Sequence, residues 1–175
     1  KLAEINGPDG IAATGGYWSA RISFLLGNPK KANYFLTKAS TRERTFYGSL
    51  AMASLGYKYN PKFDLPKYDI KLIKKISKYN GGIRALALLE VDQSHKAARE
   101  FRKIIPKFDV KDYPKLLSFI SKNNMPGLTF RLAAILRNDY GQIHLGGLYP
   151  IPAWKMDTSD LKDRALVYAI ARQES

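Results

Sequence analysis

Glu174 has the clearest potential for chemistry in this chain, because it follows a largely apolar helical stretch. That stretch begins at about residue 161, ends in Arg172-Gln173-Glu174-Ser175, and contains Leu161, Ala165, Val167, Tyr168, Ile170 and Ala171. A helix that is apolar on most sides is normally buried, and burial raises the pKa of a carboxyl because its charged form loses water. We therefore expect Glu174 to hold a proton that it donates as a general acid. The alternative is a solvated glutamate, the usual state at a helix end.

Other kinds of site find little support in the sequence. There is no cysteine, which excludes disulfides, thiolate metal sites and cysteine nucleophiles. With only His95 and His144, a histidine metal site is not expected. Gly15-Gly16 and Gly81-Gly82 lack the spacing and the lysine of a phosphate-binding loop. We predict no metal and no cofactor.

The composition describes a folded, strongly basic chain. Hydrophobic residues make up 45% of the 175 residues, and the net charge is +14. Such a charge fits nucleic acid, an anionic membrane surface or an acidic polymer as partner. The stretch from Lys67 to Lys78 forms a lysine stripe, for which a solvated helix face is the simpler interpretation. No apolar run approaches the ~18 residues needed to span a bilayer.

Apolar periodicity, capping residues and Gly/Pro breakers predict an all-α fold. The predicted helices cover residues 16–26, 29–39, 41–55, 68–78, 83–91, 94–105, 111–123, 127–138 and 161 onward. Asn28-Pro29 and Thr41 are the expected starts of the second and third helices. Ile70, Ile73 and Ile76 are expected to point inward, and Leu148-Tyr149 to lie in a loop.

The order of these elements predicts that the chain has five parts. Two helix pairs within it also form a weak internal repeat. The parts are a helical scaffold at 1–60, a linker at 61–67, a second helical domain at 68–140, a connector at 141–160 and a final helix at 161–175. Trp18–Leu36 and Ala85–Phe101 each read as helix, turn, helix, with Ala32 and Ala97 in matching places. Small residues at fixed positions of paired helices are typical of stacked hairpins of the tetratricopeptide kind.

Three segments, in consistent order, resemble the soluble lytic transglycosylase family. Tyr149-Pro150-Ile151-Pro152-Ala153-Trp154, followed by Ala165-Leu166-Val167-Tyr168-Ala169-Ile170-Ala171-Arg172-Gln173-Glu174-Ser175, is similar to the entry to that family's catalytic domain. Arg44-Thr45-Phe46-Tyr47-Gly48-Ser49-Leu50-Ala51 resembles part of its helical scaffold. The resemblance implies a tetratricopeptide-like superhelix at 1–60, a linker domain at 68–140 and the first helix of a lysozyme-like domain at 161–175.

The resemblance also implies an activity and a place in the cell. The family cleaves the β-1,4 bond between N-acetylmuramic acid and N-acetylglucosamine in peptidoglycan, leaving a 1,6-anhydro end, and works in the periplasm. Glu174 matches its acid/base glutamate, and Ser175 the serine that follows. The sugar-binding remainder of the catalytic domain is missing from 1–175, so we expect this polypeptide to be scaffold and inactive alone.

Expected partners follow from the same resemblance. Peptidoglycan strands are the first, with cell-wall synthesis proteins as further candidates, and a monomer is favoured. Arg42, Arg44, Lys71 and Lys75 are candidates for attracting stem-peptide carboxylates on charge alone. A tetratricopeptide-like adaptor without activity stays open as an alternative. A helical nucleic-acid binder explains the charge, but the chain has no helix-turn-helix spacing.

Overall fold

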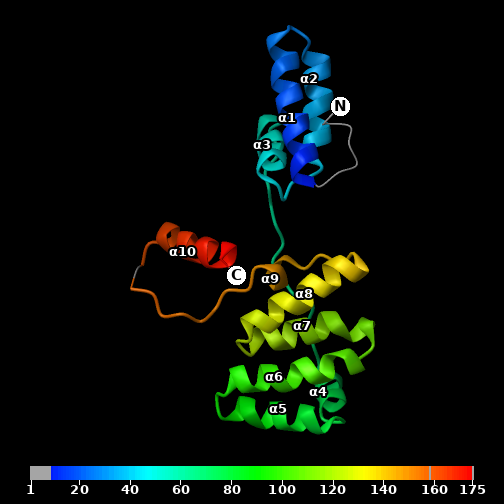
Figure 1. Cartoon of the computed structure of the whole chain (residues 1–175), viewed down its shortest axis with the longest axis vertical. Helices are drawn as coiled ribbons and strands as arrows, with labels where there is room; N and C mark the ends of the chain where they lie inside the picture. The colour runs from blue at the N-terminus through cyan, green and yellow to red at the C-terminus, as the bar shows by residue number, and fades with distance from the viewer. Residues whose placement is uncertain (1–8, 158, 175) are drawn as a thin grey trace. The chain divides into compact units, whose positions relative to one another are not determined.

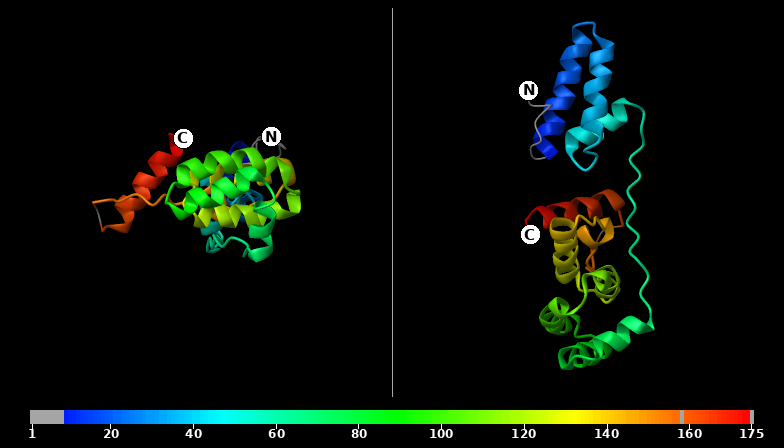
Figure 2. Two further views of the ribbon diagram at one scale, coloured as in Figure 1. Left: turned by 90° about the horizontal axis from the view of Figure 1, so that it is seen from below. Right: turned by 90° about the vertical axis from the view of Figure 1, so that its right-hand side faces the viewer.

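The computed structural model describes residues 9–157 and 159–174, and every regular element within them is a helix. The predicted all-α fold class is therefore confirmed. The chain divides into two compact units, one ending at Pro61 and the other beginning at Lys62. Residues 57–69 between the last helix of the first unit and the first helix of the second have no regular secondary structure (Figure 2).

The first unit is built from α1 (Asp9–Leu25), α2 (Pro29–Ser40) and α3 (Phe46–Ser54) (Figure 1). Gly27 has a positive φ of 70°, and the Asn28 side chain accepts a hydrogen bond from the Lys31 backbone N–H, so α1 stops and α2 starts where the sequence predicts. The first helix begins earlier than predicted, at Asp9.

Small residues form the packing face of the first unit. Its buried residues are Ala12, Ala13, Gly15, Gly16, Ala20, Ser23, Ala32, Ala39, Gly48 and Ala51. A methyl group on Gly16 would come within 3.0 Å of the Ala39 Cβ, so α1 and α2 are in close contact there. The larger apolar residues of α1, such as Trp18 and Leu25, are 51% and 79% exposed.

The start of α3 corrects a prediction. Thr41 ends α2 instead of capping α3, and its hydroxyl donates to the Lys38 carbonyl. The cap of α3 is Thr45, whose hydroxyl accepts from the Gly48 backbone N–H at 3.0 Å. The turn between the two threonines closes through a backbone hydrogen bond from Thr45 N–H to the Arg42 carbonyl.

The second unit contains the remaining helices. They are α4 (Ile70–Ile76), α5 (Asn80–Glu90), α6 (Ser94–Ile104), the 3₁₀ turns η2 (Ile105–Lys107) and η3 (Val110–Asp112), α7 (Tyr113–Lys122), α8 (Pro126–Tyr140), α9 (Leu145–Leu148) and α10 (Leu161–Gln173). The pairs α5/α6 and α7/α8 are helical hairpins joined by short turns (Figure 1). The predicted loop at Leu148 is wrong, since Leu148 ends α9 and is only 3% exposed.

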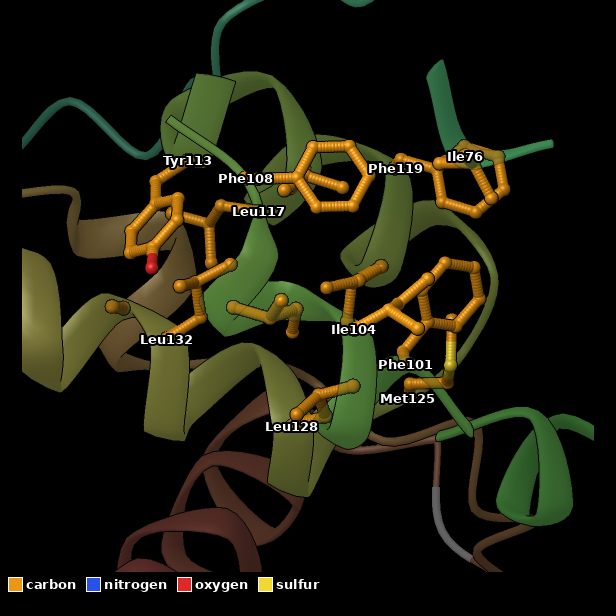
Figure 3. Packing of buried hydrophobic residues seen from close by; sticks show 14 of the residues in the cluster. Ile76, Phe101, Ile104, Phe108, Tyr113, Leu117, Phe119, Met125, Leu128 and Leu132 are labelled. Carbon is orange, nitrogen blue, oxygen red and sulfur yellow. The ribbon is translucent and has the colours of Figure 1, made fainter. Parts of the chain in front are cut away.

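One apolar core holds α4 to α9 together. Phe101 of α6 has no exposed surface, and its ring lies 5.6 Å from that of Phe119 on α7 (Figure 3). Leu72 and Ile76 are the residues that α4 buries, whereas Ile70 is 65% exposed, so the prediction that Ile70 points inward is wrong.

The two segments predicted to be repeats are both helix pairs. Ala32 and Ala97 each occupy the fourth position of the second helix of their pair, and both are buried. The intervening turns each contain a residue with positive φ, Gly27 at 70° and Asp92 at 55°. A small buried residue at the same register lets each pair pack closely.

Candidate functional site

Glu174 lies directly after α10, and residues 141–160 connect this helix to the preceding ones. The Asp160 carboxylate caps the helix by accepting from the Lys162 backbone N–H at 2.7 Å. At the other end, the Glu174 backbone N–H donates to the Ile170 carbonyl at 3.0 Å. The carboxyl-bearing residue is thus tied to the last helical turn, and its side chain is exposed.

Contacts made by Tyr168 and Arg172 attach α10 to the rest of the second unit. The Tyr168 ring stacks on Trp154 with a centroid separation of 5.9 Å, and the Tyr168 hydroxyl donates to the Pro152 carbonyl at 3.2 Å. The Arg172 guanidinium lies 4.1 Å from the centre of the Phe130 ring, a cation–π contact with α8. These contacts join the Tyr149–Trp154 segment to the helix that ends at Glu174.

The expected burial of α10 is wrong for the described residues, since none of its side chains is buried. Val167 and Ile170 are 44% and 55% exposed, and Leu161 and Leu166 more so. Val167, Ile170 and Glu174 follow the helical i, i+3, i+7 spacing and so share one face. Described residues cover α10 only partly, at Tyr168, Ala171 and Arg172, and none buries the Glu174 carboxyl.

The two arginines proposed from charge lie in the first unit. Arg42 is half-buried, its Nε atom lies 3.6 Å from an Asp9 carboxylate oxygen, and its guanidinium donates to the Lys38 carbonyl at 3.2 Å. Arg44 is exposed. Arg42 thus has internal partners, and Arg44 is the more accessible cation.

The two lysines proposed from charge lie on α4. The Lys75 ammonium donates to both carboxylate oxygens of Asp112 at 2.9 and 2.7 Å, which joins α4 to η3. This hydrogen bond raises the pKa of Lys75. Lys71 is exposed. Ser175, the remaining candidate, lies outside the described residues.

A basic pocket in the second unit was not predicted from the sequence. Its volume is about 490 Å³, and its lining comprises Lys78, Tyr79, Asn80, Gly81, Arg84, Glu100, Lys103, Ile104 and Lys107. Arg84 donates to one Glu100 oxygen through Nε and Nη2 at 3.0 and 2.7 Å, and Lys103 donates to the other at 2.8 Å. The hydrogen bonds from Lys103 and then Arg84 lower the pKa of Glu100. The only sequence signal was Asn80-Gly81-Gly82 at a helix start, beside a lysine-rich segment.

No group of three or more acidic or histidine side chains forms a metal-binding cluster in residues 9–157 and 159–174. Burial lowers the pKa of His144, because the charged imidazolium loses water. Within the described part of the chain, no helix is long and apolar enough to cross a membrane.

Comparison with known proteins gives no relative: no protein-family model, curated protein or solved structure matches this chain. The function must therefore be inferred from the residues and contacts above.

Proposed function

We propose that this chain is part of a peptidoglycan lytic transglycosylase, with Glu174 as the acid/base and most of residues 1–175 as helical scaffold. The observation that carries the proposal is the contact between two segments that resemble the family. Trp154 and Pro152 of the first segment touch Tyr168 of the second, and Glu174 ends the helix that these contacts hold. Segments that are similar to one catalytic-domain entry are thus neighbours in space as well as in sequence.

A single carboxyl is enough for the proposed reaction. Protonated Glu174 gives its proton to the glycosidic oxygen while the bond from that oxygen to C1 of N-acetylmuramic acid breaks. The carboxylate then takes the proton of the C6 hydroxyl of the same sugar as O6 bonds to C1, which regenerates the acid. Two-carboxylate glycosidases need a second residue to bind or activate a nucleophile, whereas an intramolecular hydroxyl already has a high effective concentration.

The scaffold role rests on the exposure of Glu174. General-acid catalysis at neutral pH favours a carboxyl in a poorly solvated site, and the described residues leave Glu174 open to water. We therefore propose that residues 1–175 alone do not cleave peptidoglycan. A periplasmic location and peptidoglycan as partner belong to the same proposal.

The test is digestion of purified peptidoglycan by the complete gene product that contains residues 1–175. We expect soluble fragments that end in 1,6-anhydro-N-acetylmuramic acid, lighter by one water than hydrolysis products in mass spectrometry. Glu174→Gln should abolish release, because the amide has no acidic proton to donate, and the matched variant Glu43→Gln on the exposed α2–α3 turn should not. Undiminished release by Glu174→Gln refutes the assignment, and lysis by residues 1–175 alone refutes the scaffold role.

The second candidate is a tetratricopeptide-like adaptor that binds a protein and has no activity. Exposed apolar side chains at the end of α1 and in the turn that follows favour it: Phe24, Leu25 and Leu26 are 69–79% exposed. If the complete gene product releases no fragments from peptidoglycan, yet pulls down one protein in a manner that Leu25→Ser and Leu26→Ser abolish, the adaptor is the better account.

A further inference from the structure

The basic pocket between the start of α5 and the end of α6 holds more positive than negative charge. Four of its lining side chains are cationic, and Glu100 is its only acid. Glu100 is already bound by Arg84 and Lys103. Lys78 and Lys107 form no ion pair with any described carboxylate, so two cations at this pocket remain unneutralised.

The backbone of α5 adds donors to the same pocket. The helix begins at Asn80, no side chain of the described residues caps it, and its first turn has no acidic residue. The first N–H groups of a helix lack intrahelical acceptors and carry a partial positive charge. Gly81 lies close to α6, since a methyl group there would come within 3.0 Å of Ile104 Cγ2 and 3.4 Å of a Glu100 oxygen.

Apolar surface lies next to these charges. The Tyr79 ring and Ile104 belong to the lining, and Tyr79 is fixed because its hydroxyl donates to the Lys107 carbonyl at 3.0 Å. The Lys107 ammonium lies 5.9 Å from the centre of the same ring. The volume of about 490 Å³ exceeds the needs of a lone inorganic anion, since a water molecule takes up only about 30 Å³.

We propose that this pocket binds the free C-terminal carboxylate of a short peptide. The carboxylate lies between Lys78, Lys107 and the first N–H groups of α5, and a small apolar side chain of the peptide lies against Tyr79 and Ile104. The Glu100 carboxylate, held by two cations in the same pocket, is an internal example of this recognition. The proposal does not depend on Glu174, so the pocket keeps its role whether or not the chain takes part in glycan cleavage.

The test is an NMR titration of ¹⁵N-labelled residues 1–175 with N-acetyl-alanyl-alanine, the same peptide as its C-terminal amide, and inorganic phosphate. We expect saturable shifts of the Gly81, Gly82 and Arg84 amides with the free-carboxylate peptide, weakened by added salt because exposed charges are screened. The amide should bind at least about tenfold more weakly, since one charge-assisted contact is worth about that factor. Phosphate should bind more weakly than the free-carboxylate peptide.

Charge-matched variants separate the pocket from the general basic surface. Lys78→Gln with Lys107→Gln should weaken binding about tenfold or more, while Lys74→Gln with Lys96→Gln, which are exposed and outside the lining, should leave it unchanged. Spectra of the unliganded variants verify folding, and the Tyr79 contact persists because it uses the Lys107 backbone. Equal binding of the amide, preference for phosphate, or equal effects of the two double variants would each overturn the proposal.

Discussion

Replacing Phe101 by alanine should destabilise the second unit more than a comparable change elsewhere in it. Phe101 has no exposed surface and its ring packs at a tilt against that of Phe119, so it joins the α5/α6 hairpin to the α7/α8 hairpin. Truncation removes the transfer free energy of the ring, about 1.5–3 kcal/mol, and leaves a cavity between helices that relax only partly. The expected total is a loss of about 3–5 kcal/mol, a large part of the roughly 5–15 kcal/mol that stabilises a typical domain.

The assay is urea unfolding of residues 1–175, followed by circular dichroism, with Phe63→Ala as the matched control. Phe63 belongs to the same unit but is 52% exposed, so deletion of the same atoms should cost under about 1 kcal/mol. The expected result is a large drop in the midpoint of the second unit's transition for Phe101→Ala and a small one for Phe63→Ala. Equal losses would refute the view that Phe101 is the packing link between the hairpins.

Two further predictions concern the first unit and the acid range. Gly48→Ala should lower the unfolding free energy of the first unit, measured by thermal unfolding, because the new methyl group would collide with the Arg42 carbonyl. The control is Gly10→Ala, whose methyl group would meet no atom within 4 Å. This change should be neutral or stabilising by up to about 1 kcal/mol. The folded-state pKa of Glu100 lies below its ordinary value of 4.5, so its ion pairs stabilise the second unit above that pH and lose their effect as the pH falls below it. A stability–pH profile of Glu100→Gln should therefore be flatter below pH 4.5 than that of the unmodified chain, and parallel profiles would contradict this.

Local sequence signals predict helix ends only where the deciding contact is local. The stop at Gly27 and the cap at Asn28 depend on neighbours within three or four residues, and both predictions are confirmed. Thr41 and Thr45 are both plausible caps by residue type. The structure selects Thr45 because the chain first makes a turn closed on the Arg42 carbonyl, which the residue pattern does not reveal.

Which face of a helix packs was harder to predict than its existence. In α1 apolar residues occur on all sides, and close helix packing selects the small ones, Ala13 and Ala20, over Trp18. The candidate sites depend still more on distant residues. The Arg84–Glu100 ion pair and the Trp154–Tyr168 stack join residues 16 and 14 positions apart, and no local pattern specifies such pairs.

The exposed face of α10 connects packing to the proposed chemistry. Val167, Ile170 and Glu174 share that face, while the contacts through Tyr168 and Arg172 leave it uncovered. A surface that extends over Ile170 to the end of α10 would also remove water from Glu174, because residues four apart are neighbours on one helix face. In the proposed reaction, the contact that buries these apolar residues would also exclude water from the carboxyl that donates the proton. Under the proposed function, a polar substitution such as Ile170→Ser should therefore weaken both the docking of that surface and the acid step, whereas the same change at Leu161, at the far end of α10, should leave the acid step intact.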